Sequence, residues 1–170
     1  MKADLIVLNI KDLTTFKGVC RPVYGEAMEH PVHIPHAGIA ILDGKIIAVA
    51  SSDEISAQFS PTETIDATGL IALPGFVDCH THPVFVHTRE GEFAQRLKGA
   101  TYVEIAKAGG GIRSTIASTR DASEEMLFDL AARRLERMIT QGTTTLEAKS
   151  GYGLDTISEL KQLSVIKKLG

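Results

Sequence analysis

The sequence predicts an α/β protein in which a β-rich segment precedes a body built from a parallel sheet or barrel. After residue 75 the apolar patterns follow the order strand, helices, strand, helix, which is typical of parallel strands covered by helices. Before residue 74 the apolar runs are short and separated by turn residues, which is typical of strands and hairpins. The change falls at Pro74-Gly75. We therefore expect one part over residues 1–73 and a second over residues 74–170.

Length and composition limit the class of protein. The 170 residues are 44% hydrophobic, which is ample for a packed core. The 18 basic and 21 acidic residues give a net charge of −3, so charge offers no argument for a nucleic-acid partner or an anionic membrane surface. The apolar run at residues 5–8 is far shorter than a signal peptide's apolar region or the ~20 residues of a membrane span. With only Cys20 and Cys79, no disulfide framework is implied, and a soluble cytoplasmic protein is expected.

The first part contains five short apolar segments that we expect to be strands, namely residues 4–10, 39–42, 45–49, 64–67 and 70–73. Asp43-Gly44 separates the second and third segments and predicts a tight hairpin, because glycine accepts a positive φ. Thr68-Gly69 marks a turn between the last two. Residues 21–36 contain three prolines and little periodicity, which predicts an extended loop.

The second part begins with an extended segment at residues 76–82, followed by a loop. Apolar residues from Phe93 onward are compatible with a helix that Gly99 interrupts. The run of glycines at residues 109–111 ends this helical stretch.

A clearer helix follows, with Asp121 as the expected N-cap because Glu124 stands three residues later. Its apolar stripe comprises Leu127, Leu130, Ala131, Leu135 and Met138. Gly142 ends it, and residues 143–149 then read as a strand. Thr156 and Glu159 open a last helix. The apolar face expected for that helix comprises Leu160, Leu163, Ile166 and Leu169.

The strongest local motif is His80-Thr81-His82, at the end of the first strand of the second part. Side chains alternate along a strand, so the two histidines face the same side and could bind one divalent cation such as zinc or iron. Cys79 points the opposite way and is excluded as a ligand. Two partly buried histidines without a metal are the competing interpretation of an isolated His-x-His. The carboxyl end of a strand, where α/β barrels place their active sites, favours the metal site.

Three further histidines, His30, His33 and His36, form a competing group. Pro31 and Pro35 prevent a regular helix, so these histidines do not share a defined face. We therefore interpret them as part of a solvated loop.

Arg89 lies in the loop that leaves the first strand, where a guanidinium could hold a substrate carboxylate through two parallel hydrogen bonds. The alternative is a surface arginine paired with Glu90 or Glu92. The glycines at residues 109–111 are not followed by Gly-Lys-Ser/Thr, so they favour a tight turn or a close approach to a small ligand over nucleotide binding.

The segment at residues 149–153 ends the second strand and contains two glycines and Tyr152. A mobile backbone and a phenol donor are typical of a ligand-facing loop, although a simple strand-to-helix turn has the same composition. Glu147 and Lys149 share a face of the strand, and we expect an ion pair between them.

The run of residues 74–82, Pro-Gly-Phe-Val-Asp-Cys-His-Thr-His, resembles the metal-binding strand that opens the barrel of the amidohydrolase superfamily. Within that superfamily the chain resembles the imidazolonepropionase family. The narrower resemblance is carried by residues 88–93, 109–112, 119–120 and 143–154. It extends over essentially the whole chain.

This resemblance implies part of a metal-dependent (β/α)8 TIM barrel, preceded by part of a small β-sandwich. It implies that His80 and His82 are the first two ligands of one zinc or iron ion. Arg89 and Tyr152, and also Tyr102, match substrate-contacting positions. The implied reaction is hydrolysis of the cyclic amide of 4-imidazolone-5-propanoate to N-formimidoyl-L-glutamate, in a homodimeric enzyme of histidine degradation.

Two features depart from the family pattern. Val86-His87 stands where small residues are expected, which affects the loop that leads to Arg89. The family's remaining metal ligands and its acidic general base come from later strands, so no catalytic residue is assigned in this chain. A barrel needs ~250 residues, and we expect the N-terminal portion of a roughly 400-residue enzyme. The first alternative is another amidohydrolase, such as a deaminase or a different cyclic-amide hydrolase. The second is a non-catalytic fragment or binding module.

Overall fold

The computed structural model describes residues 1–16, 18 and 21–170. These residues form two compact units, Met1–Pro74 and Gly75–Gly170, which are described separately. Of the two cysteines, Cys79 is a free, exposed thiol, while Cys20 lies outside the described residues. In the part of the chain that the structure describes, no helix combines the length and apolar character needed to cross a membrane.

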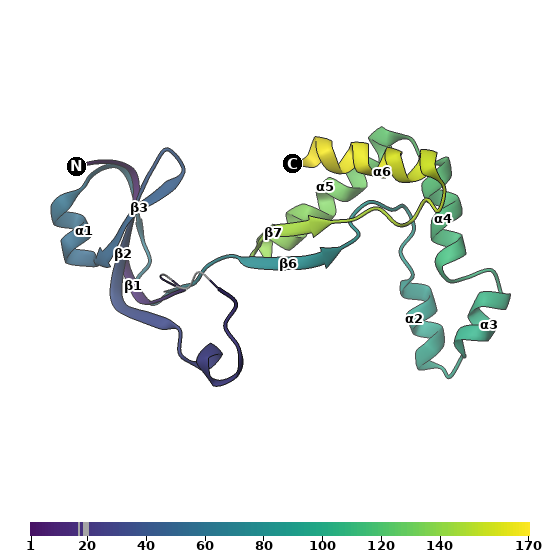
Figure 1. The fold of residues 1–170 in the computed structure, drawn as a ribbon, viewed down its shortest axis with the longest axis horizontal. Helices are drawn as coiled ribbons and strands as arrows, with labels where there is room; N and C mark the ends of the chain where they lie inside the picture. Colours follow the sequence, from purple (N-terminus) through teal and green to yellow (C-terminus); the bar gives the residue numbers. More distant parts are fainter. Residues whose placement is uncertain (17, 19–20) are drawn as a thin grey trace. The chain divides into compact units, whose positions relative to one another are not determined.

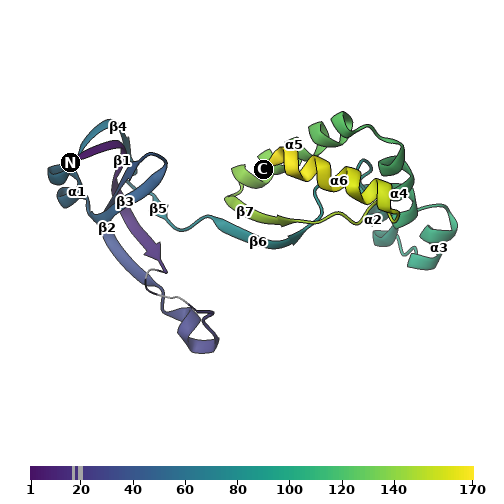
Figure 2. The ribbon, with the colours of Figure 1, turned by 45° about the horizontal axis from the view of Figure 1, so that its top comes forward.

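The first unit is a five-stranded sheet with one short α-helix and one 3-10 helix (Figures 1 and 2). Its elements are β1 (Lys2–Thr15), a 3-10 helix (Gly25–Glu29), β2 (Val32–Leu42), β3 (Lys45–Ser51), α1 (Ser52–Gln58), β4 (Ser60–Asp66) and β5 (Ile71–Ala72). β1 is central: it pairs antiparallel with β2 along one edge and parallel with β4 and β5 along the other. All five predicted strands are therefore present.

The predicted hairpin between β2 and β3 is confirmed. Leu42 pairs with Lys45, and Asp43 and Gly44 between them have φ of 51° and 70°. Two successive positive φ values match the twist of antiparallel strands, which is why this turn requires residues that tolerate the left-handed region.

The expectation of a loop over residues 21–36 is wrong from Val32 onward, where β2 begins. Pro35 lies inside this strand opposite Asp12 of β1. The pairing of β2 with β3 starts only at Ala37, so Pro35 sits in a stretch with a strand on one side alone. Proline is tolerated there, because its missing N–H removes no bond to a second neighbour.

Helix α1 was not predicted, although the sequence carries its start signal. The Ser51 hydroxyl accepts from the Glu54 N–H, and the Glu54 carboxylate accepts from the Ser51 N–H, which forms a capping box. Ile55 of this helix packs with Phe59 and Ile6 in the core of the sheet. Seven residues are too few to show helical periodicity.

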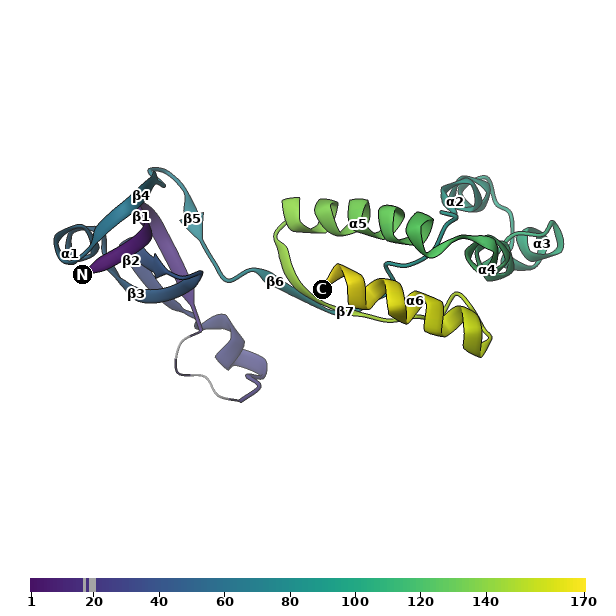
Figure 3. The same cartoon turned by 90° about the horizontal axis from the view of Figure 1, so that it is seen from above.

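The second unit is an α/β unit with two parallel strands and five helices, as the alternation of patterns predicted (Figures 1 and 3). Its elements are β6 (Phe76–Thr81), α2 (Glu90–Leu97), α3 (Tyr102–Lys107), α4 (Ile112–Asp121), α5 (Glu124–Thr140), β7 (Thr143–Ala148) and α6 (Thr156–Leu169). Helices α5 and α6 lie side by side along the strand pair (Figure 3). The core they enclose consists of Val84, Leu127, Ala131 and Val165.

One helix start differs from the prediction. The N-cap of α5 is Ser123, whose hydroxyl accepts from the Met126 N–H, and not Asp121. Asp121 instead ends α4, a helix that follows the glycine run and was not predicted. The start of α6 at Thr156 agrees with the prediction; its N-cap is Asp155, whose carboxylate accepts from the Ser158 N–H. In each helix, the residue directly before the first helical residue supplies the oxygen for the free N–H groups.

The buried face of α6 also differs from the prediction. Ser158, Gln162 and Val165 are buried, whereas Leu160 and Leu163 are exposed. Only the end of the predicted stripe, Ile166 and Leu169, packs against the core. The inward face of α6 is therefore partly polar, and this polar side holds the loop described below.

Candidate functional site

His80 and His82 come together at the end of β6, as the strand periodicity predicted. Their ring centroids are 5.1 Å apart and the rings are inclined by 74°. The Asp78 carboxylate accepts from the His80 N–H at 3.0 Å and so fixes the backbone at this point. The Nδ1 atom of His82 is buried and has no hydrogen-bond partner among the described residues.

This geometry suits a shared metal ion. With metal–nitrogen bonds of about 2.1 Å, two imidazoles at a tetrahedral angle have ring centroids about 5 Å apart. The separation of His80 and His82 is close to that value. No group of three or more His, Cys, Asp or Glu residues suited to a metal occurs in the described ranges. The chain therefore offers two imidazole donors, which is fewer than the three protein ligands usual in a catalytic zinc site.

Tyr152, from the loop after β7, reaches the same place. The centroid of the Tyr152 ring lies 5.7 Å from that of the His82 ring. It lies 5.2 Å from the centroid of the Phe85 ring, which belongs to the loop after β6. Gly151 allows this approach: a Cβ there would lie 2.8 Å from Cε1 of His82, and its φ of 148° is rarely adopted by other residues. The ends of the two parallel strands thus meet at His82.

The loop that carries Tyr152 is held by side chains of α6. The buried side chain of Gln162 accepts from the Tyr152 N–H at 3.2 Å. The Glu159 carboxylate accepts from the N–H groups of Gly153 and Leu154, both at 2.7 Å. Burial acts to raise the pKa of the Glu159 carboxyl, but the Ser150 hydroxyl and these two amides favour the carboxylate, so its pKa lies below the usual value.

Arg120 of α4 completes this arrangement. Its Nε donates to the Gly153 carbonyl at 2.6 Å and lies 2.9 Å from the Asp155 carboxylate. The Tyr152 loop is therefore fixed from two helices, and it is not a loose strand-to-helix turn.

The loop after β6 is held from α4 and α5. The Thr119 hydroxyl of α4 accepts from the Val86 N–H at 3.3 Å, and the Thr115 hydroxyl donates to the His87 carbonyl at 3.4 Å. Val86 packs against the core of the unit, and His87 is exposed on the loop. The unusual Val86-His87 pair is thus accommodated by one inward and one outward side chain.

Arg89 directly precedes α2, and its side chain is exposed. Among the described residues, Arg89 makes no ion pair with Glu90 or Glu92, which was the alternative interpretation of this arginine. The Glu92 carboxylate accepts instead from the Gly111 N–H at 2.6 Å. The Thr88 hydroxyl bonds the Glu90 carboxylate and holds its pKa below the usual range. The guanidinium of Arg89 is left available to another anion.

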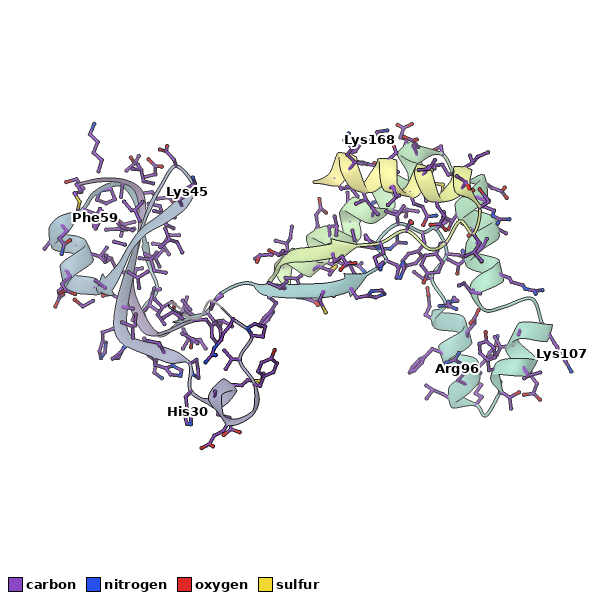
Figure 4. All side chains as sticks on the ribbon, viewed as in Figure 1. His30, Lys45, Phe59, Arg96, Lys107 and Lys168 are labelled. Carbon is purple, nitrogen blue, oxygen red and sulfur yellow. The ribbon has the colours of Figure 1, made fainter. Side chains whose placement is uncertain are left out.

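Tyr102 begins α3 and is exposed. Its ring lies 6.0 Å from the guanidinium of Arg96 on α2. Helices α2 and α3 form a pair beyond the ends of β6 and β7, and Figure 4 labels Arg96 on this pair. The structure therefore brings together His80, His82 and Tyr152, while Tyr102 contacts a different residue.

The competing histidines lie in the first unit. His33 lies in β2 and contacts the Asp12 carboxylate at 2.9 Å, so it is not in a free loop. His30 follows the 3-10 helix and is exposed. In the second unit, the predicted Glu147–Lys149 ion pair is present at 3.6 Å between exposed side chains.

Sequence reasoning missed the side chains that hold the two loops, chiefly Gln162, Glu159 and Arg134. Arg134 of α5 donates to carbonyl groups of the loop after β6. Polar residues inside amphipathic helices look like solvent-facing positions, and their spacing carries no signal for a contact made far away in the sequence. Glu159 was expected only to open the last helix, whereas its carboxylate accepts from the N–H groups of Gly153 and Leu154, which precede that helix.

Comparison with known proteins gives close relatives in sequence. The chain is 49% identical over 169 residues to an imidazolonepropionase of Thermoanaerobacter pseudethanolicus and 43% identical over 170 residues to one of Streptococcus sanguinis. Each match covers 99% of the chain and 40% of the relative. The chain thus spans well under half the length of these relatives. No family model matches the sequence.

Solved structures with the same fold include several hydrolases and deaminases. Escherichia coli guanine deaminase has a TM-score of 0.66 at 18% identity and covers 96% of this chain and 34% of its own. A triazine hydrolase variant has a TM-score of 0.61 at 21% identity, covering 98% of this chain and 33% of its own. A zinc-bound adenosine deaminase of Xanthomonas campestris has a TM-score of 0.56 at 18% identity, covering 98% of this chain and 32% of its own.

By fold, the chain thus belongs with the α/β architecture of these enzymes. By sequence, it is homologous over its whole length to the imidazolonepropionases. This confirms the resemblance inferred from the motifs around His80 and Tyr152.

Proposed function

We propose that the protein carrying this chain is an imidazolonepropionase, which hydrolyses the cyclic amide of 4-imidazolone-5-propanoate to N-formimidoyl-L-glutamate. The observation that carries the proposal is the meeting of His80, His82 and Tyr152 at the ends of two parallel strands. It occurs in a chain 49% identical to a protein of that name. Parallel α/β folds place their ligands at this end of the strands.

The two histidines would supply two ligands of one zinc or iron ion. Their ring separation and the unpartnered Nδ1 of His82 support this role. The adenosine deaminase with the same fold contains zinc, which supports a divalent metal. A zinc or iron ion held by these histidines would supply Lewis-acid activation of water at neutral pH. The remaining ligands and the general base belong to other parts of the intact protein.

Arg89 would hold the propanoate group of the substrate. Its guanidinium makes no ion pair among the described residues and can form two parallel bonds to a carboxylate. The Tyr152 phenol, beside His82, would donate a hydrogen bond to the substrate ring. Tyr102 would act as a further contact if α3 approaches the site in the intact enzyme.

In this proposal, residues 1–73 are part of a composite β-sandwich and residues 74–170 form the first βα units of a (β/α)8 barrel. The five-stranded sheet and the parallel β6–β7 pair support these assignments. The chain would be the N-terminal portion of a homodimeric, cytoplasmic enzyme without nucleic-acid or membrane partners.

The test is ring opening by the intact protein loaded with zinc or, separately, with iron. We expect one molecule of N-formimidoyl-L-glutamate to form for each molecule of 4-imidazolone-5-propanoate consumed. Arg89→Ala should chiefly raise KM, whereas Arg113→Ala, an arginine on α4, serves as the control. Absence of product with either metal, or turnover of a different cyclic amide or an aminopurine instead, would contradict the proposal.

A further inference from the structure

Arg134 of α5 is a cation that contacts the loop after β6. Its half-buried side chain extends from α5, and Nη1 donates to the carbonyl groups of Pro83 and Phe85 at 2.9 and 2.7 Å. Nη2 lies 3.5 Å from the carbonyl of Val86. One guanidinium therefore gathers three carbonyl groups from the segment that runs from His82 toward Arg89.

The same guanidinium lies over the Phe85 ring, 3.8 Å from its centroid. This distance is well inside the range of favourable cation–π contacts. Phe85 in turn contacts Tyr152, and Tyr152 contacts His82. A continuous series of contacts therefore connects α5 to the histidine pair.

A packing role alone does not require an arginine here. The neighbouring inward residues of α5, Leu127 and Ala131, are apolar and fully buried. No carboxylate pairs with Arg134 in the described part of the chain, and burial lowers the pKa of its guanidinium. Keeping a charge without a carboxylate partner in a half-buried position costs free energy. This cost indicates that the hydrogen bonds of Arg134 have the role of holding the loop after β6.

We infer that Arg134 is a positioning residue, which fixes the loop between His82 and Arg89 and, through Phe85, the ring of Tyr152. It does not touch the substrate. It would keep Arg89 and Tyr152 at the separation that the substrate requires. The inference rests on the proposed function for its kinetic part, and on the ring contacts alone for its structural part.

The test uses Arg134→Met and Arg134→Lys in the intact enzyme, with Arg133→Met, on the exposed side of α5, as the matched control. Methionine replaces the aliphatic part of the arginine side chain but leaves the carbonyl groups without a donor. We expect kcat/KM to fall roughly 10- to 100-fold, mostly through KM, with metal content close to wild type. Lysine, which can still donate to the carbonyls, should restore part of the loss. The control Arg133→Met should change neither kcat/KM nor KM.

A second readout does not depend on activity. In metal-free protein labelled with fluorotyrosine, the resonance of Tyr152, assigned by its loss in Tyr152→Phe, should shift in Arg134→Met and in Phe85→Leu but not in Arg133→Met. An unshifted resonance in Arg134→Met, or an unchanged KM, would overturn the inference. If Arg134→Met does not fold, Arg134→Lys decides: an unshifted Tyr152 resonance together with an unchanged KM in that variant would overturn the inference. Failure of the wild-type enzyme to open the ring would count against the proposed function and leave the resonance test intact.

Discussion

The loops that follow β6 and β7 meet at His82, and the side chains that make most of the bonds to each loop differ in chemical type. In the first loop, a cation holds carbonyl groups: Arg134 donates to Pro83 and Phe85. In the second, acceptors hold N–H groups: Glu159 accepts from Gly153 and Leu154, and Gln162 accepts from Tyr152. Each loop also has one bond of the other kind: Thr119 accepts from the Val86 N–H, and Arg120 donates to the Gly153 carbonyl.

A site on loops can be held rigidly when helix side chains bind the backbone of each loop. Loop backbone groups near a core must find partners, because a buried group left unpaired costs roughly 1–3 kcal/mol. Here the partners come from α4, α5 and α6, and not from neighbouring strands. We therefore expect substitutions on these helices, away from the proposed ligands, to loosen one loop or the other separately.

The largest effect is expected where the two loops touch. Gly151→Ala would place a Cβ 2.8 Å from Cε1 of His82 and impose an unfavourable φ of 148°. We expect roughly a 100-fold fall in kcat/KM of the intact enzyme, together with weaker metal binding, because a displacement of about 1 Å at a site has such an effect. Gly99→Ala is the matched control, since Gly99 also has a positive φ but has nothing within 4 Å of a Cβ. Equal losses in both variants would show that strain alone, and not contact with His82, is responsible.

A smaller effect is expected when the second loop alone loses a partner. Gln162→Leu leaves the Tyr152 N–H without its acceptor and should lower the free energy of unfolding by about 1–3 kcal/mol. Hydrogen exchange should quicken at residues 150–154 and stay unchanged at residues 83–87. Equal acceleration in both loops would contradict their independent anchoring.

The converse change affects the first loop. Thr119→Val removes the acceptor of the Val86 N–H, a longer bond of 3.3 Å, and we expect a loss of about 1 kcal/mol. Exchange should now quicken at residues 83–87 only. Thr140→Val, at the exposed end of α5, controls for the change of side chain.

The smallest effect is a change in pH dependence. Because the folded pKa of Glu159 lies below its unfolded value, ionised Glu159 stabilises the fold above about pH 4.3. This contribution is lost as the pH falls through the lower, folded pKa. Glu159→Gln keeps an acceptor oxygen but does not titrate, so the difference in melting temperature between the two proteins should shrink on acidification. A difference that is constant from pH 7 to pH 3 would contradict this assignment.

The sequence predicted the elements whose signals are local. The Asp43-Gly44 hairpin, the two parallel strands and the pairing of His80 with His82 follow from turn chemistry and strand periodicity. Helices α1 and α4 are short and lack a long apolar stripe, so they were missed.

The supporting side chains could not be predicted in the same way. The distance between Arg134 and Phe85, or between Gln162 and Tyr152, depends on how α5 and α6 pack on the strands. The inward face of α6 was misjudged because Gln162 is a buried polar residue, whereas hydrophobicity favoured Leu160 and Leu163. Its burial is understandable only once the Tyr152 N–H is seen to need an acceptor.

The central claim, that His80 and His82 hold a metal ion beside Tyr152, is tested most directly by the metal content of the intact protein. We predict one zinc or iron ion per chain in the wild type and in the control His33→Ala, and substoichiometric metal in His80→Ala and His82→Ala. Stoichiometric metal in either of the last two variants would remove that histidine from the ligand set and contradict the account.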